Sequence, residues 1–148
     1  SQFILTTLKI KKIVIEKDEF DISVRRLFNY GHCIGHSIEA ASNYKIPHGI
    51  AICFGMKFAN LLSYKKKYLN KIDLIRFNNI INKNLVKSNL IKKISFKKIL
   101  IHLHRDKKNS NQKINIILTK GIGKMFVEEI LDINILSNTW LQLVAKHK

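Results

Sequence analysis

The histidine-rich segment between residues 29 and 48 constrains the fold of this chain more than any other feature. His32 and His36 stand four residues apart, a spacing that places two side chains on one face of a helix. His48 follows the single proline of the chain, at the expected start of the next helix. Neutral imidazole is the commonest side-chain ligand for metals, and it binds zinc at about 2.0–2.1 Å. The spacing therefore predicts two consecutive helices that bring three imidazoles to one metal-dependent site.

Helix geometry alone leaves the ligand set open. Glu39 lies one turn beyond His36 on the same expected face, so His32, His36, His48 and Glu39 are all candidate ligands. The competing interpretation is a group of core histidines that are hydrogen-bonded to the backbone. A glycine adjoins each histidine, and glycine allows the close approach of a substrate or of another helix. We favour the functional site.

Apolar residues recur with a helical period along most of the chain, and this pattern predicts a mainly α fold. Residues 113–119 are instead rich in β-branched side chains, and the glycines that follow predict a turn into a second short strand at 124–127. We expect one domain, residues 1–148, with a small β-hairpin. The expected helices cover residues 6–16, 23–41 with Asp21 or Ser23 as its cap, 49–64, 71–84, 95–104 and 133–146.

Composition excludes several classes of protein. The hydrophobic fraction of 46% excludes a wholly disordered chain. No apolar run approaches the roughly 20 residues that span a bilayer, and the first residues lack the features of a signal peptide. The two cysteines, Cys33 and Cys53, give no disulfide framework, so we expect buried reduced thiols. These features predict a cytoplasmic protein without a membrane partner.

The formal net charge of +17 invites a nucleic-acid interpretation. The 27 basic residues are spread along a chain that is also rich in isoleucine and asparagine, which favours compositional drift over a binding face. We therefore expect no nucleic-acid partner, whereas an acidic or phosphorylated small molecule is compatible with the charge. A basic helical module that binds nucleic acid or a protein partner is the non-enzymatic alternative.

Arg25 and Asn29 precede the histidines on what should be a similar face of the same helix. A guanidinium group suits phosphate or carboxylate, so Arg25 is a candidate substrate ligand. A structural ion pair with Asp18 or Glu19 is the alternative.

The ordered set of polar residues resembles the 3-dehydroquinate synthase and sugar-phosphate cyclase family. The resemblance implies a mainly α, metal-binding C-terminal domain whose N-terminal NAD-binding domain is absent from this chain, in which no Gly-x-Gly-x-x-Gly motif occurs. The matching residues are Lys11, Asp18-Glu19, Arg25, Asn29, Gly31-His32, Gly35-His36, Glu39, His48-Gly49, Asp106-Lys107-Lys108 and Ile122-Gly123.

The resemblance also assigns roles. It implies that His32 and His48 bind the metal, with a glutamate from the preceding domain as third ligand, and that Glu39 is not a ligand. It implies that His36 is catalytic. The implied cofactors are NAD and Zn or Co. The substrate ligands would be Lys11, Arg25, Asn29 and one of Lys107 and Lys108.

The implied reaction is that of a phosphate-eliminating lyase of the shikimate pathway, which supplies aromatic amino acid biosynthesis. Bound NAD⁺ oxidises a secondary alcohol of a heptulosonate phosphate, phosphate leaves, the ketone is reduced, and an aldol step closes a carbocycle. A homodimer is implied for the full-length enzyme, and the isolated chain is expected to be inactive and to bind metal weakly. Ile50 stands where the family usually has glutamate, so the resemblance leaves a different sugar phosphate open as the substrate. A metal-dependent polyol dehydrogenase is a further alternative.

Overall fold

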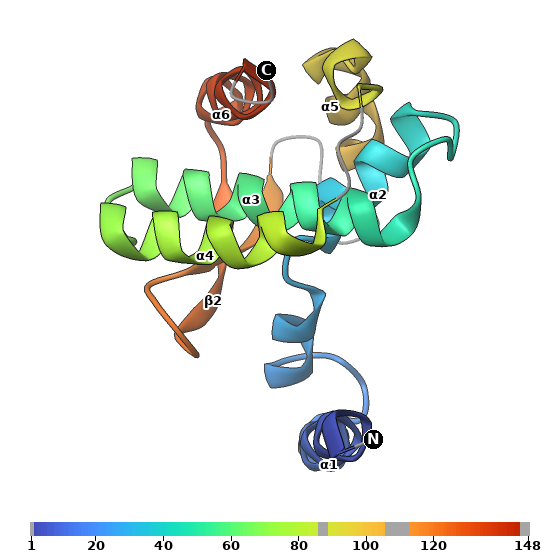
Figure 1. The fold of residues 1–148 in the computed structure, drawn as a ribbon, viewed down its shortest axis with the longest axis vertical. Coiled ribbons are helices and arrows are strands. Elements are labelled where there is room, and N and C mark those ends of the chain that lie inside the picture. Colours follow the sequence, from blue (N-terminus) through green and yellow to red (C-terminus); the bar gives the residue numbers. More distant parts are fainter. Residues whose placement is uncertain (1, 86–88, 106–112, 146–148) are drawn as a thin grey trace.

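The computed structural model describes residues 2–85, 89–105 and 113–145. The described chain is mainly helical with one two-stranded antiparallel sheet, which confirms the predicted fold class (Figure 1). The elements in chain order are α1 (Gln2–Lys17), the 3₁₀ helix η1 (Val24–Asn29), α2 (His32–Ala41), α3 (His48–Lys65), α4 (Lys71–Asn84), the 3₁₀ helix η2 (Ile91–Lys93), α5 (Phe96–Arg105), β1 (Ile114–Thr119), β2 (Met125–Ile130) and α6 (Ile133–Ala145).

Helix α3 forms the centre of the molecule, because α2, α4, α6 and β1 all pack against it. Apolar residues occur on every side of this helix, a pattern that is typical of a helix buried all round. Phe54, Phe58 and Leu62 are each no more than 1% exposed. Trp140 of α6 is equally buried, and its indole N–H donates to the carbonyl of Ile94 at 3.1 Å.

Glycines set the distance between α2 and α3. A Cβ added to Gly55 would lie 2.0 Å from the carbonyl oxygen of Gly31, so the two backbones touch at this point. A Cβ on Gly35 would meet the Ile52 side chain at 2.5 Å and its Cα at 3.1 Å. This close approach holds the first turn of α2 against the N-terminal half of α3.

The predicted continuous helix over 23–41 is wrong. Gly31 adopts a left-handed conformation with φ of 80°, which separates η1 from α2. The physical reason is tertiary: a Cβ on Gly31 would lie 2.6 Å from the backbone nitrogen of Met56 in α3, so only glycine fits there. The predicted cap is also wrong, because α2 begins after Gly31, and the side chain of Ser23 makes no capping hydrogen bond to η1.

Asp18 organises the turn instead of the expected caps. Its carboxylate accepts backbone N–H bonds from Ile22 at 2.9 Å, Ser23 at 2.8 Å and Arg25 at 2.9 Å. Loss of water around the carboxylate raises its pKa, but the three hydrogen bonds outweigh this effect and lower the pKa to about 2. Asp18 therefore fixes the backbone conformation of the turn between α1 and η1.

The hairpin pairs Ile114 with Ile130 at one end and Thr119 with Met125 at the other. Its turn contains Gly121 at φ of 143° and Gly123 at 69°, conformations that favour glycine. The second strand runs to residue 130 rather than to the expected 127. The hairpin is anchored to α3, because the N–H of Thr119 donates to the hydroxyl of Ser63 at 3.1 Å.

Helix α1 differs from the rest, since none of its residues is buried. Figure 1 shows it at the far end of the molecule from α2, α5 and α6. Phe3, Ile4, Leu5 and Leu8 are between 57% and 87% exposed. The helix begins four residues before the predicted start.

Within the described ranges, no helix combines the length and the apolar character that crossing a membrane requires.

Candidate metal centre and adjoining cavity

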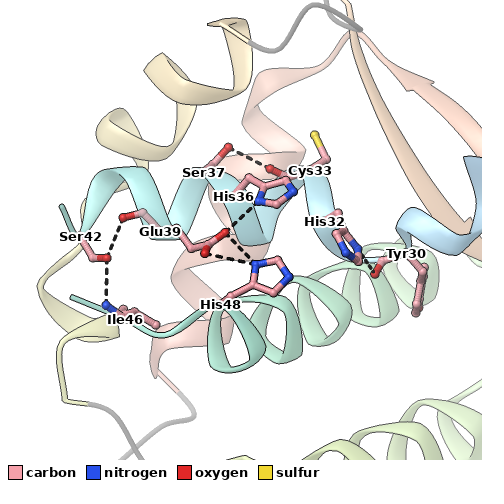
Figure 2. A network of polar contacts seen from close by, with 9 residues as sticks. All are labelled: Tyr30, His32, Cys33, His36, Ser37, Glu39, Ser42, Ile46 and His48. Carbon is pink, nitrogen blue, oxygen red and sulfur yellow. Dashed lines mark hydrogen bonds and ion pairs between the residues drawn. The ribbon is translucent and has the colours of Figure 1, made fainter. Parts of the chain in front are cut away.

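Three imidazoles converge where α2 meets α3 (Figure 2). His32 and His36 come from the first two turns of α2, and His48 opens α3. The ring centroids of His32 and His36 lie 5.5 Å apart, those of His32 and His48 5.7 Å, and those of His36 and His48 5.4 Å. The structure therefore brings together the three histidines that the sequence singled out.

Glu39 joins two of these rings. Its Oε2 lies 2.8 Å from Nδ1 of His36, and both carboxylate oxygens lie 3.2 Å from Nδ1 of His48. The Glu39 side chain is 12% exposed, whereas those of His36 and His48 are 59% and 56% exposed. Burial alone would raise the pKa of Glu39, but the hydrogen bonds and positive charge of the two imidazoles shift it below its ordinary value.

His32 has a different environment. Its Nδ1 lies 3.4 Å from the carbonyl oxygen of Tyr30, and the residue is half-buried. Burial is the main cause that lowers its pKa; the neighbouring His36 and His48 add to this, while the Tyr30 carbonyl and Glu39 oppose it. A lowered pKa favours the neutral imidazole, which is the form that binds a metal.

The donor set fits a divalent ion. Two imidazoles on one tetrahedral zinc, each at about 2.0–2.1 Å, would have ring centroids on the order of 5 Å apart. The three observed separations lie close to that value. One ligand atom each from His36, Glu39 and His48 also lies within 4.8 Å of the others. The predicted pair of ligands, His32 and His48, is the most widely separated of the three pairs.

A cavity of about 300 Å³ adjoins the imidazoles. Asn29, His32 and His36 line it, so the structure brings three of the predicted site residues to one cavity. Polar side chains that the sequence did not predict as site residues also line it, namely Asp21, Arg26 and Asn115. The Nδ2 of Asn29 lies 3.5 Å from Oδ2 of Asp21.

No local pattern in the sequence connected the cavity-lining residues Arg26 and Asn115 with the site. Arg26 stands beside Arg25, and only the 3₁₀ geometry of η1 decides which of the two faces the cavity. Asn115 comes from β1, far from the histidines in the chain, and nothing local in the sequence connects it with them. Cys33 also lines the cavity. Both Cys33 and Cys53 are half-buried, whereas the sequence predicted buried thiols.

Among the described residues, the other predicted substrate ligands, Lys11 and Arg25, do not line the cavity. The guanidinium of Arg25 donates to the backbone carbonyl of Glu19 at 2.5 Å, and its backbone N–H bonds Asp18. Lys11 lies on α1, at the opposite end of the molecule from α2 (Figure 1). Lys107 and Lys108 lie outside the described residues.

Comparison with protein families matches this chain to the 3-dehydroquinate synthase C-terminal model over residues 1–109. Curated relatives include the 3-dehydroquinate synthase of Dictyoglomus thermophilum, which is 36% identical over 133 residues, covering 89% of this chain and 37% of the relative. That of Pelagibacter ubique is 35% identical over 132 residues, covering 83% of this chain and 36% of the relative.

Solved structures share the fold. A crystal structure of 2-deoxy-scyllo-inosose synthase complexed with carbaglucose-6-phosphate, NAD⁺ and Co²⁺ aligns with a TM-score of 0.83 and 25% identity, over 95% of this chain and 40% of that one. The 2-epi-5-epi-valiolone synthase of Streptomyces hygroscopicus, with NAD⁺ and Zn²⁺ bound, aligns with a TM-score of 0.70 and 18% identity, over 89% of this chain and 36% of that one.

This chain thus spans less than half the length of these relatives, and the imidazole cluster falls within the matched part. The family match, the identities above 30% and the shared fold agree with the motif from Arg25 to Glu39. The chain belongs to the 3-dehydroquinate synthase C-terminal family.

Proposed function

We propose that this chain is the metal- and substrate-binding part of a 3-dehydroquinate synthase, a phosphate-eliminating lyase that converts a heptulosonate phosphate into a carbocycle. The observation that carries the proposal is the cluster of His32, His36 and His48 beside a cavity that polar side chains help to line, in a chain of this family. Curated relatives at 35–36% identity are 3-dehydroquinate synthases, which favours this substrate over others of the superfamily.

His32 and His48 would hold a divalent Zn or Co ion, and His36 would transfer a proton to or from the substrate. Bound NAD supplies a hydride acceptor and the metal a Lewis acid. The carboxylate that completes the ligand set would come from a nucleotide-binding part outside these 148 residues. The lowered pKa of His32 supports its assignment as a ligand, because it keeps the imidazole neutral.

His36 is placed to move a proton. It lines the cavity, and its Nδ1 is engaged by Glu39, so its Nε2 is the atom available to a substrate group. Asn29 also lines the cavity and can hydrogen-bond a substrate hydroxyl. Arg26 supplies a cation there that suits phosphate or carboxylate.

Further proposals concern activity, two of the predicted ligands and the full-length enzyme. Without the nucleotide-binding part the chain holds no NAD and only part of the ligand set, so we expect no turnover by the chain alone and weak metal binding at most. Lys11 and Arg25 would reach substrate only in an assembly that places α1 and η1 beside the cavity. We also propose a homodimer, a cytoplasmic location and a role in aromatic amino acid biosynthesis for the full-length enzyme.

A second candidate is another sugar-phosphate cyclase. The similarity to 2-deoxy-scyllo-inosose synthase, at a TM-score of 0.83, favours it, as does Ile50 in the place of a usual family glutamate. Its substrate would be a hexose phosphate rather than a heptulosonate phosphate. The chemistry expected of His36 is the same in both cases.

Phosphate release tests the proposal. The chain would be combined with the nucleotide-binding half of the Dictyoglomus thermophilum relative, NAD⁺ and Co²⁺, and offered a heptulosonate phosphate, a hexose 6-phosphate or an unphosphorylated polyol. Phosphate release from the heptulosonate phosphate alone is expected, with no net NADH. Release only from the hexose phosphate would favour the second candidate, and NADH accumulation with the polyol would contradict both.

Substitution of single residues tests which side chain transfers the proton. His36→Asn should lower the rate of phosphate release by about 10²–10⁴-fold, the usual contribution of a general acid or base. His102→Ala on α5 is the control and should leave the rate unchanged. Tight stoichiometric Zn²⁺ binding by the chain alone, measured by isothermal titration, would count against the shared ligand set.

A further inference from the structure

A single carboxylate connects two imidazoles that the proposed function uses differently. Glu39 contacts Nδ1 of His36 at 2.8 Å and Nδ1 of His48 at 3.2 Å. An ionised carboxylate only accepts hydrogen bonds, so each contact requires a proton on Nδ1. The neutral form of each imidazole then carries its lone pair on Nε2.

The third ring follows the same pattern. The Nδ1 of His32 lies 3.4 Å from the carbonyl oxygen of Tyr30, which is also an acceptor only. Figure 2 shows the rings of His36 and His48 extending from Glu39 toward the side of His32. Each ring is therefore held at its Nδ1 edge and presents Nε2.

Glu39 is more buried than the two imidazoles that it contacts. Its side chain is 12% exposed, against 59% for His36 and 56% for His48. The carboxylate sits behind the imidazoles, while the rings extend into solvent. A group that orients metal-binding and catalytic imidazoles occupies this kind of position.

We propose that Glu39 is a positioning residue that fixes the Nδ1–H tautomer of both His36 and His48, so that the same carboxylate orients a metal ligand and a catalytic base. The consequence for catalysis rests on the proposed function, whereas the tautomer is a property of the metal-free chain. Outer-shell partners of this kind typically change metal affinity or activity by about 10–100-fold.

Nuclear magnetic resonance of the metal-free 148-residue chain tests the tautomer directly. With ¹⁵N-labelled histidine and a pH at which the imidazoles are neutral, long-range ¹H–¹⁵N spectra distinguish Nδ1–H from Nε2–H. His36→Asn and His48→Asn variants assign the signals. We expect Nδ1–H for both residues in the unmodified chain. Nε2–H at either residue would overturn the proposal.

The variant Glu39→Gln keeps the size of the side chain but offers one acceptor oxygen in place of two. Oε2 alone contacts both rings, but a neutral amide accepts hydrogen bonds more weakly than a carboxylate, so the Nδ1–H tautomer of both imidazoles should become less populated, and Glu39→Ala should release both. Glu128→Gln, a half-buried glutamate that contacts Lys66 and Tyr68 away from the histidines, is the matched control and should change neither signal. Unchanged tautomers in Glu39→Gln and Glu39→Ala would overturn the proposal, provided that circular dichroism shows both variants folded.

Cobalt absorption supplies a second readout. Co²⁺ titrated into the chain should bind Glu39→Gln about 10–100-fold more weakly, with an unchanged visible spectrum at saturation. A changed spectrum would identify Glu39 as a direct ligand and overturn the positioning role. Failure of the phosphate-release assay would contradict the proposed function while leaving the tautomer result intact, so the two proposals fail separately.

Discussion

Helices α1 and α3 have similar lengths and opposite environments. The 16 residues of α1 include no buried side chain, whereas most of the 18 residues of α3 are buried. Both sequences are rich in apolar residues, and both were expected to be helical. The difference lies in what covers them, because α3 is enclosed by four other elements and α1 touches mainly η1.

The comparison separates two sources of helix formation. Local hydrogen bonds and propensity form α1, although isolated helices of this length are marginal in water. Burial stabilises α3, which tolerates an internal glycine, Gly55, although glycine lowers helix propensity. The packing around α3 holds His48 at a fixed position beside α2.

The largest expected effect is the removal of a core ring from α3. Phe58 is fully buried, so Phe58→Ala should lower the free energy of unfolding by about 3–5 kcal/mol, through lost transfer energy and a cavity. Phe3→Ala in α1, where the ring is 87% exposed, should change it by less than about 0.5 kcal/mol. Urea unfolding measures both, and a comparable loss at Phe3 would show that α1 is covered in solution.

The contact between α2 and α3 predicts the next effect. Gly55→Ala would force a Cβ to 2.0 Å from the Gly31 carbonyl oxygen, so we expect a net loss of about 2 kcal/mol despite the better helix propensity of alanine. Gly49→Ala is the matched control on the same helix, because nothing lies within 4 Å of its added Cβ. That variant should be neutral or stabilising by up to about 1 kcal/mol. Equal unfolding midpoints for the two variants would contradict the backbone contact.

Asp18, at the junction of α1 and η1, predicts a dependence of stability on pH. Its folded-state pKa of about 2 lies below the ordinary value of 3.8. The contribution of the carboxylate is therefore complete above 3.8 and is lost as the pH falls through about 2. Asp18→Asn should lower stability at about pH 5 and flatten its fall between about pH 4 and 2, measured by urea midpoints. An unchanged acid limb would rule out the carboxylate as its cause.

The smallest expected effect belongs to the surface of α1. Lys12 and Glu16 form an ion pair of 3.7 Å in which both side chains are largely exposed. Glu16→Gln should change the free energy of unfolding by no more than about 0.5 kcal/mol, and added salt should abolish the difference. A loss that persists at high salt would indicate that α1 is buried against a partner.

The fold could be predicted where periodicity was strong. The expected helix at residues 71–84 matches α4, and that at 49–64 differs from α3 by one residue at each end. The helix expected over 23–41 failed because nothing local marks Gly31 as left-handed. The conformation of Gly31 accompanies its close contact with Gly55 and Met56, which lie on the next helix of the chain.

In the candidate site, too, some features could be predicted from the sequence and others could not. The spacing of His32 and His36 placed both imidazoles on one helix, and the proline before His48 marked the start of the next. The role of Glu39 as a link between two rings was not predicted, because it depends on the position of α3 beside α2. Arg26 and Asn115 were missed for the same reason, since the tertiary fold brings them to the cavity.

The sequence by itself determined the helical class, the histidine motif and the family, since these follow from residue types at fixed local spacings. Only the tertiary structure decided which nitrogen of each imidazole is engaged, which arginine faces the cavity and which apolar helix is buried. Those outcomes depend on contacts between residues far apart in the chain, and the approach of α2 to α3 through glycine sets them.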